Sequence, residues 1–417
     1  MTPFLLLALA GPPADAPKPV AATREASKDQ LEAHKKATPR LPLPPVTDGP
    51  FAKVNNGRYR NFYLPPGLVM AHGIGGREKD PAETLDPTFK VKLFWVASRA
   101  NNCLYCLGHQ EHKLLAAGVP EDGIAALDVG WELLPPAERA AVAFARRLTV
   151  EPHTVTEADV LTLAKHYTPT QVLEIVVAVA GFNSMNRWTD GLNIPADENG
   201  DFFKKGTDHD LSTFRTPTAE TFRGKRSLVA VVGSDTLGPP AWPARPALED
   251  RSAVEAAWAA SRGRKPTLPL ADGPGANWVR LLTTFPTSGA GRVAGQQAAA
   301  ETGELPPRVK AEIAWAAART DRAWYALDLA RTRLKAVGLS DDQVFALDAG
   351  DGLPEADRAV VAFARKLTAA PATVTDADVA GLRKLFPDKQ VAEIVHQVCA
   401  AAFLNRVTEV ARLPLDQ

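Results

Sequence analysis

Apolar residues recur every three or four positions along most of this chain, which is the spacing of amphipathic helices and not of strands. The longest such runs cover residues 91–117 and 309–337, with few helix-breaking residues inside them. They stop at Gly118 and Gly338, where a glycine fits the C-terminal cap of a helix. The pattern predicts one long helix in each segment.

Further helices are predicted in pairs. Residues 136–148 and 355–367 carry shorter amphipathic patterns, and residues 169–187 and 388–406 carry the most apolar ones. Because a helix that is apolar on most sides is normally buried, the last two are expected at the centre of the core. The only strand-like run is 228–232, so we predict an all-α fold.

The pairs reflect an internal repeat. Residues 141–149 read AVAFARRLT and residues 360–368 read VVAFARKLT, so seven of nine positions are identical. Other motifs return in the same order at an offset of 219 or 220 residues. We therefore predict two tandem helical bundles that pack their long apolar helices together as a pseudo-twofold pair.

The repeat also suggests domain boundaries. Residues 21–195 form the first bundle and 268–417 the second, joined by a Pro- and Gly-rich connector, 196–267, with local helix near 248–262. Residues 1–20 contain a short apolar run followed by Ala-x-Ala motifs. This start can be read as a signal peptide, although no Lys or Arg precedes it. We expect an exported protein, periplasmic or secreted; the alternative is a cytoplasmic protein with a disordered apolar start.

Composition narrows the classes of partner. Lys and Arg total 48, as do Asp and Glu, so the net charge gives no support for nucleic acid or an anionic membrane surface. No stretch approaches the roughly 20 apolar residues of a membrane-spanning helix. Three cysteines in 417 residues do not make a disulfide scaffold. Cys399 lies in an apolar helical run and is expected to be a small core residue.

The candidate chemistry lies between residues 101 and 112. Cys103, Cys106, His109 and His112 are spaced by three, so on one helix each lies about one turn from the next. A c-type haem site needs His directly after the second Cys, where Leu107 stands. Zinc bound by all four is excluded, because nine helical residues rise about 13 Å. A partial zinc site completed by outside ligands stays open.

A redox-active dithiol fits the spacing better. Such a dithiol needs two thiols within one turn and a nearby base. The alternative is a purely structural role, with two buried cysteines on a packed helix. The repeat provides an internal comparison, because the positions of the two cysteines and the first histidine hold Ala323, Ala326 and Leu329 in the second copy. Groups that could do chemistry are absent there, while Tyr105 returns as Tyr325.

Other shared polar residues have a structural interpretation. Glu174 and Glu393 lie in the middle of apolar helices, and Arg187 and Arg406 occupy matching positions. Because buried charges are normally paired, we expect these four residues to form structural ion pairs.

The chain resembles the carboxymuconolactone decarboxylase and alkylhydroperoxidase D superfamily. The resemblance rests on residues 102–109, which read NCLYCLGH, on the turn at Gly118, on the helix 139–149 and on the closing Asn186 and Arg187. It covers most of residues 50–195 and, without the active site, 268–417. It implies an all-α fold that oligomerises through its helices.

The resemblance also implies roles for the site residues. Cys106 would be the attacking thiol, Cys103 the resolving thiol and His109 the base. Two departures stand out: the family's histidine usually follows the second cysteine by four residues, not three, and the family's upstream glutamate is missing, with Lys92 near its place. In the absence of that glutamate, Lys92 or His112 could lower a thiol pKa electrostatically.

The expected activity is that of a thiol-dependent peroxidase or disulfide oxidoreductase. Its substrate would be a hydroperoxide and its reductant a dithiol or a protein; no cofactor and no metal ion are expected. Homo-oligomers through the helical faces are also expected. The alternatives are a catalytically degenerate scaffold or binding protein, and a carboxymuconolactone decarboxylase-like activity, which does not depend on the cysteine pair.

Overall fold

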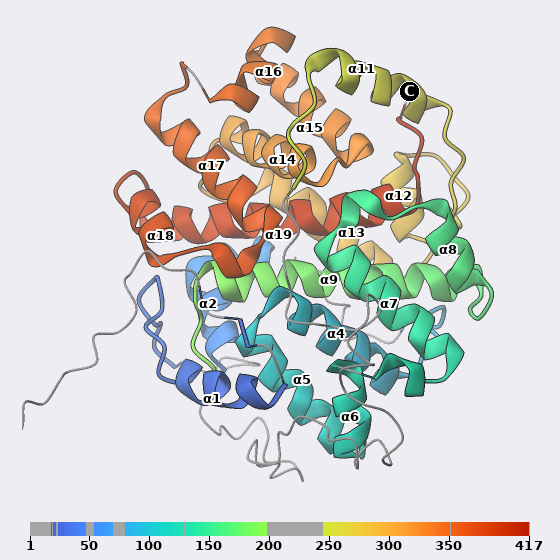
Figure 1. The fold of residues 1–417 in the computed structure, drawn as a ribbon. Helices are drawn as coiled ribbons and strands as arrows, with labels where there is room; N and C mark the ends of the chain where they lie inside the picture. The colour runs from blue at the N-terminus through green and yellow to red at the C-terminus, as the bar shows by residue number, and fades with distance from the viewer. Residues whose placement is uncertain are drawn as a thin grey trace, which may run out of the picture.

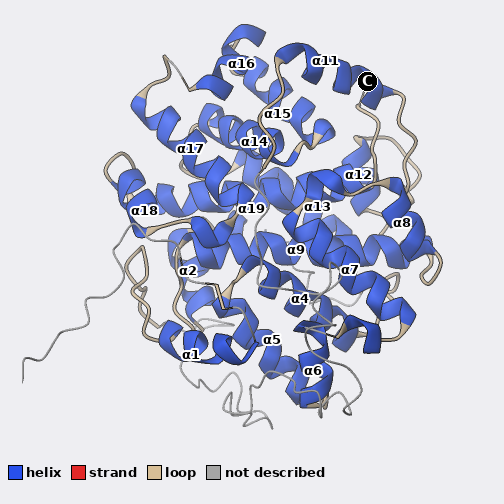
Figure 2. Ribbon diagram, in the orientation of Figure 1, coloured by secondary structure: helices blue, strands red, loops and turns tan. Residues whose placement is uncertain are grey.

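The computed structural model describes residues 18, 20–21, 24–46, 54–69, 80–128, 130–197, 245–350 and 352–416. Every regular element in these ranges is a helix, and they contain no strand (Figure 2). The prediction of an all-α fold is therefore confirmed. The strand-like run at 228–232 and the predicted signal peptide lie outside the described residues.

The helices divide between the two halves of the chain. The first half contains α1 (Arg24–His34), α2 (Asn55–Tyr63), α3 (Pro66–Val69), α4 (Pro87–Asn101), α5 (Leu104–Ala116), α6 (Glu121–Asp128), α7 (Pro136–Val150), α8 (Glu157–Ala164) and α9 (Pro169–Gly191). The second half contains α11 (Arg251–Arg262), α12 (Asn277–Leu282), α13 (Ser288–Glu301), α14 (Pro307–Asp321), α15 (Trp324–Ala336), α16 (Asp341–Ala349), α17 (Glu355–Ala369), α18 (Asp376–Arg383) and α19 (Asp388–Val410). Short 3-10 turns lie at Trp131–Leu133, Pro152–Thr154 and Pro371–Thr373.

The prediction of one continuous helix at 91–117 is wrong, and so is that at 309–337. The first segment is divided into α4 and α5 at Asn102 (φ 53°), and the second into α14 and α15 at Arg322 (φ 53°). A left-handed residue reverses the backbone and ends a helix. The ends of α5 and α15 were predicted correctly, because Gly118 (φ 80°) and Gly338 (φ 94°) follow them.

The two most apolar helices lie side by side through the middle of the molecule (Figure 1). Helix α9 is buried along nearly all of its length, and so is α19, as predicted for the centre of the core. In Figure 1 α1, α4, α5 and α6 of the first half lie below this pair, and α11, α14, α15, α16 and α17 of the second half lie above it. The central pair therefore joins the two halves.

Arginines on the central helices reach across between the halves. The Arg187 guanidinium donates to the carbonyl of Thr368 (2.7 Å), and that of Arg406 donates to the carbonyl of Thr149 (3.3 Å). Arg406 also forms the expected ion pair, with Asp321 at 3.3 Å. Arg187 instead binds backbone carbonyls, so the prediction of an ion pair is wrong for that residue. Burial, and after it the charge of Arg406, holds the pKa of Arg187 well below its ordinary value.

The mid-helix glutamates have the predicted structural role. Glu174 accepts hydrogen bonds from two backbone amides ahead of α4 and pairs with Lys90 at 2.8 Å. Glu393 accepts from two backbone amides ahead of α14 and pairs with Lys310 at 3.3 Å. Each carboxylate thus ties the segment before a helix to the central helix of its own half.

The connector is described only at its two ends. Residues 198–244 lie outside the described ranges, and the helix expected near 248–262 is confirmed as α11. Helix α11 packs on α15, as α1 packs on α5.

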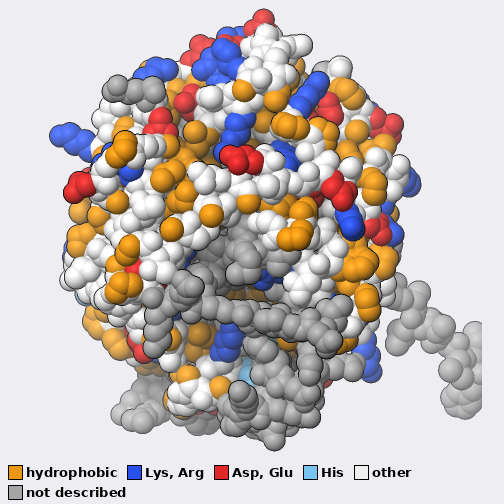
Figure 3. Space-filling model, turned by 180° about the vertical axis from the view of Figure 1, so that it is seen from behind, with side chains coloured by type: hydrophobic (Ala, Val, Ile, Leu, Met, Phe, Trp, Pro, Cys, Tyr) orange, Lys and Arg blue, Asp and Glu red, His pale blue; other side chains and the backbone are white. Residues whose placement is uncertain are grey.

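Cys399 is fully buried, as predicted. Among the described helices none has the length and hydropathy needed to cross a bilayer. Figure 3 shows apolar and charged side chains interspersed over the described part of one face.

Candidate functional site

The first turn of α5 holds the two candidate thiols. Cys103 precedes the helix as its N-cap, and its sulfur accepts a hydrogen bond from the Cys106 amide at 3.4 Å. The break at Asn102 creates this geometry, since a continuous helix would have used that amide internally. The amide end of a helix favours negative charge, which at Cys103 opposes the effect of burial.

A threonine on α9 brings the two sulfurs under one hydroxyl. The Thr189 Oγ1 lies 3.0 Å from Sγ of Cys103 and 3.3 Å from Sγ of Cys106. Both cysteines are reduced, with exposed fractions of 0% and 2%. The repeat could have indicated this contact, because Thr189 returns as Thr408, but the sequence gave no reason to place it on the thiols.

The two thiols have different electrostatic surroundings. Burial raises the pKa of Cys103 well above its ordinary value, and the Cys106 thiol and the Asp190 carboxylate raise it further. Lys113, two turns along α5, interacts electrostatically with Cys106, although the net effect of its surroundings is to lower the Lys113 pKa, mainly through desolvation. The thiol at 103 is therefore held in its protonated form, and a cation lies near its neighbour. Asp190 and Lys113 were not predicted.

His109 is held by contacts at both ring nitrogens. Its Nδ1 lies 2.9 Å from the Tyr105 carbonyl and its Nε2 lies 3.3 Å from Oδ2 of Asp197. The ring also stacks on that of Tyr105, with centroids 4.5 Å apart. Both partners are oxygen atoms on fixed parts of the fold, so the two contacts set the orientation of the ring.

Asp197 organises this side of the site, and the sequence analysis missed it. It accepts hydrogen bonds from the Asn55 amide (2.6 Å) and the Tyr105 hydroxyl (2.7 Å), besides facing His109. Burial alone would raise the pKa of Asp197, but the contact with His109, followed by these two hydrogen bonds, outweighs burial, and the pKa lies below the ordinary value. A signal was present, since Pro195 and Asp197 return as Pro414 and Asp416 at the same offset.

The second half builds the same network without the histidine. Asp416 accepts hydrogen bonds from the Tyr325 hydroxyl and the Asn277 amide. Leu329 occupies the position that corresponds to His109. The carboxylate–tyrosine contact is therefore part of the packing in both halves, and only the first half adds a titratable ring to it.

One of the two residues expected to lower a thiol pKa is engaged by another side chain. Lys92 binds Glu138 on α7 at 2.9 Å, so its charge is neutralised away from the thiols. His112 is buried on α5. Lys113 is the lysine whose charge interacts with Cys106.

Comparisons with known proteins add one finding. No family model matches the sequence, and no curated protein matches it. Among solved structures, a variant of the debrominase Bmp8 crystallised with 2,3,4-tribromopyrrole is similar over 41% of this chain and 90% of its own, with 18% sequence identity and a TM-score of 0.31.

Proposed function

We propose that the first half acts as a thiol-dependent peroxidase or disulfide oxidoreductase of the alkylhydroperoxidase D type. The observation that carries this proposal is the placing of Cys103 and Cys106 at a helix N-terminus with both sulfurs on the Thr189 hydroxyl. Two thiols within one turn can form a disulfide with little backbone movement. The catalytic groups are Cys106, Cys103 and His109.

In the proposed reaction the Cys106 thiolate attacks the terminal oxygen of a hydroperoxide. His109, as the proposed base, takes up the proton of the Cys106 thiol and returns it to the alkoxide as the O–O bond breaks, so the alcohol leaves and Cys106 becomes a sulfenic acid. The Cys103 sulfur then attacks Cys106, a disulfide forms and water leaves. An external dithiol or protein reductant restores both thiols. The raised pKa of Cys103 supports its resolving role, because a protonated thiol does not compete for the peroxide.

The proposal includes the tandem architecture. The reciprocal bonds of Arg187 and Arg406, the paired roles of Glu174 and Glu393, and the matched breaks of the two long helices support two related bundles packed as a pseudo-twofold pair. The second bundle lacks the thiols. Export of the protein, and its assembly through helical faces, stay as proposals that follow from the sequence.

A second candidate is a helical scaffold or binding protein with vestigial cysteines. The burial of both thiols favours it, since a peroxide must reach the sulfur of Cys106. A low-pKa, reactive Cys106 would distinguish the enzyme from the scaffold.

Mass spectrometry after brief peroxide treatment tests the roles. We expect the native protein to lose two hydrogens, as Cys103 and Cys106 join, and to regain them with a dithiol reductant. The Cys103→Ser variant should stop at a sulfenic acid on Cys106, and Cys106→Ser should stay reduced. Faster oxidation of Cys103 would reverse the roles. Oxidation no faster than that of the buried Cys399 would favour the scaffold.

A further inference from the structure

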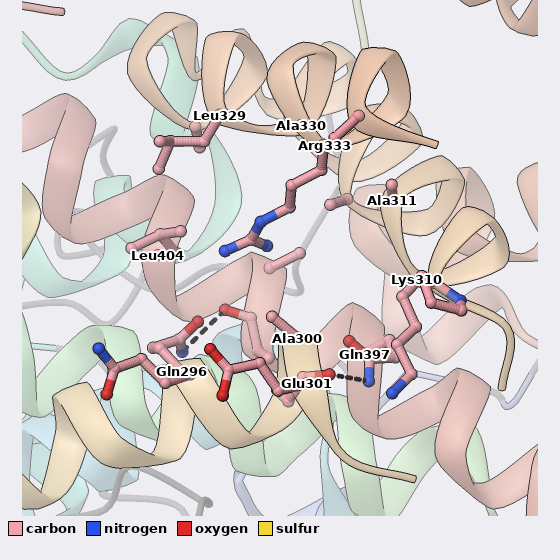
Figure 4. Close-up of a pocket in the computed structure, with 18 of the residues that line it drawn as sticks. Gln296, Ala300, Glu301, Lys310, Ala311, Leu329, Ala330, Arg333, Gln397 and Leu404 are labelled. Carbon is pink, nitrogen blue, oxygen red and sulfur yellow. Dashed lines mark hydrogen bonds between the residues drawn. The ribbon is translucent and has the colours of Figure 1, made fainter. Parts of the chain in front are cut away.

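A pocket of about 350 Å³ lies in the second half, between α13, α14, α15 and α19 (Figure 4). Its wall includes Ala326 and Leu329, at the positions that correspond to Cys106 and His109. The exchange of cysteine for alanine removes a sulfur atom from this place. An alanine that lines open space thus stands at the position of a buried thiol in the first half.

Most of the pocket wall is apolar and made of small side chains. Alanines from all four helices contribute, among them Ala300, Ala311, Ala330 and Ala401, together with Leu404. Such a wall buries the apolar part of a ligand without steric obstruction. The volume is at the lower end of the roughly 300–1,000 Å³ that small-molecule sites occupy, so a small ligand is indicated.

One cation points into this apolar space. The Arg333 side chain extends from α15 toward the centre of the pocket (Figure 4) and has no hydrogen bond or ion pair within the described residues. Burial lowers the pKa of Arg333, while the charge of Glu301 across the pocket raises it. Arg331 on the same helix differs, because it binds the Asp341 carboxylate through two nitrogens, each at 2.9 Å.

A buried acceptor completes the polar groups. Gln397 is 7% exposed and its amide nitrogen donates to the Ala299 carbonyl at 2.7 Å. Its Oε1 accepts no hydrogen bond in the part of the chain that the structure describes. The other lining cation, Lys310, is engaged by the Thr302 carbonyl and by Glu393. Arg333 is thus the donor that a ligand can use, and Gln397 an acceptor that can receive a ligand hydroxyl.

We propose that this pocket binds a small amphipathic carboxylic acid, with its carboxylate on Arg333 and its apolar body against the alanine wall. A guanidinium matches a carboxylate with two parallel hydrogen bonds. A phosphate ester would call for further donors, and the Lys310 ammonium is already engaged. The site is separate from the thiols and goes beyond the proposed peroxidase activity.

Calorimetric titration of the full chain with octanoate tests the proposal, with 1-octanol and octylamine as uncharged and cationic analogues. We expect one octanoate site and at least about tenfold weaker binding of both analogues. Arg333→Gln should weaken octanoate binding about tenfold, and Ala326→Leu should block it by filling the pocket. Glu301→Gln should tighten it severalfold, because a competing carboxylate is removed. Arg331→Gln is the matched control and should bind normally.

Equal octanoate binding by wild type, Arg333→Gln and Ala326→Leu would overturn the proposal, as would a preference for octylamine or no binding at millimolar octanoate. Thermal unfolding of Ala326→Leu shows whether that variant folds, and Arg333→Gln provides an independent result if it does not. Oxidation of Cys103 and Cys106 in the same variants should be normal, so failure of this site is distinguishable from failure of the peroxidase proposal.

Discussion

One residue distinguishes two otherwise matched hydrogen-bond networks. In each half a carboxylate accepts from a tyrosine hydroxyl and from a backbone amide, at Asp197 and at Asp416. Only Asp197 also faces a histidine. The shared contacts are present in both halves, so the histidine is what the first half adds to them. This contrast allows packing and catalysis to be separated by substitution.

Asp197→Asn should slow the oxidation of Cys106 about tenfold or more, because His109 loses the carboxylate that orients it. The pKa of Asp197 is lowered, so its stabilising contribution is present above pH about 4 and is lost as the pH falls through that lowered value. The variant should lack this acid transition and lose about 1–3 kcal/mol at neutral pH. Stopped-flow oxidation and urea unfolding at several pH values measure both effects.

Asp416→Asn is the matched control. It removes the hydrogen bonds to Tyr325 and Asn277, which correspond to those of Asp197 with Tyr105 and Asn55. Asp416 is exposed and faces no histidine in the described residues. It should lose less stability and leave the oxidation rate unchanged. Equal slowing in both variants would assign the effect to packing and count against a role for His109.

At the scale of the element, helix type and central position could be predicted, but the division of the long helices could not. Asn102 is a residue that tolerates the left-handed region, whereas Arg322, at the matching break, carries no such signal. The left-handed conformation there follows from how α14 and α15 pack, which is tertiary information. The placing of Thr189 on both sulfurs depends on the same packing of α9 against α5.

The contact between the central helices can be tested at a glycine. A Cβ on Gly191 would lie 2.9 Å from Cγ1 of Val395 on α19 and 3.3 Å from Cδ2 of Leu367 on α17. Because Val395 is buried and stiff, Gly191→Ala should cost about 1–3 kcal/mol. Gly291 on α13 has open space around its Cβ position, so Gly291→Ala should instead gain about 0.5–1 kcal/mol. Chemical denaturation measures both, and a neutral Gly191→Ala would contradict the close approach of α9 and α19.

At the scale of the whole molecule, the two halves share a core but differ in the residues at the position of the thiol site. The first holds two thiols next to the Thr189 hydroxyl, and the second has alanines at those positions, one of which, Ala326, lines a pocket. The interface arginines bind backbone carbonyls of the opposite half, so each half completes the other's hydrogen bonds. Loss of one half should therefore destabilise the other.

Two buried histidines make the stability of the whole chain depend on pH. Burial, with the charge of Lys18, lowers the pKa of His34 on α1 to about 3. Burial, with the charges of Arg60 and Lys310, lowers the pKa of His396 on α19 to about 3. In the unfolded chain both would titrate near pH 6.5, so unfolding takes up protons between pH 6.5 and 3. The free energy of unfolding is therefore not reduced by these histidines above pH 6.5, and it decreases as the pH falls from 6.5 to 3.

Urea unfolding at pH 7, 6, 5 and 4 should show a free energy of unfolding that falls by about 1.4 kcal/mol per pH unit for each histidine. His34→Gln and His396→Gln should each reduce that slope by one proton, whatever their effect on stability at pH 7, since glutamine does not titrate. His166→Gln is the control, because His166 is exposed, and it should leave the slope unchanged. A slope that stays the same in both core variants would mean that the buried histidines are protonated in the folded protein, contrary to the burial that lowers their pKa.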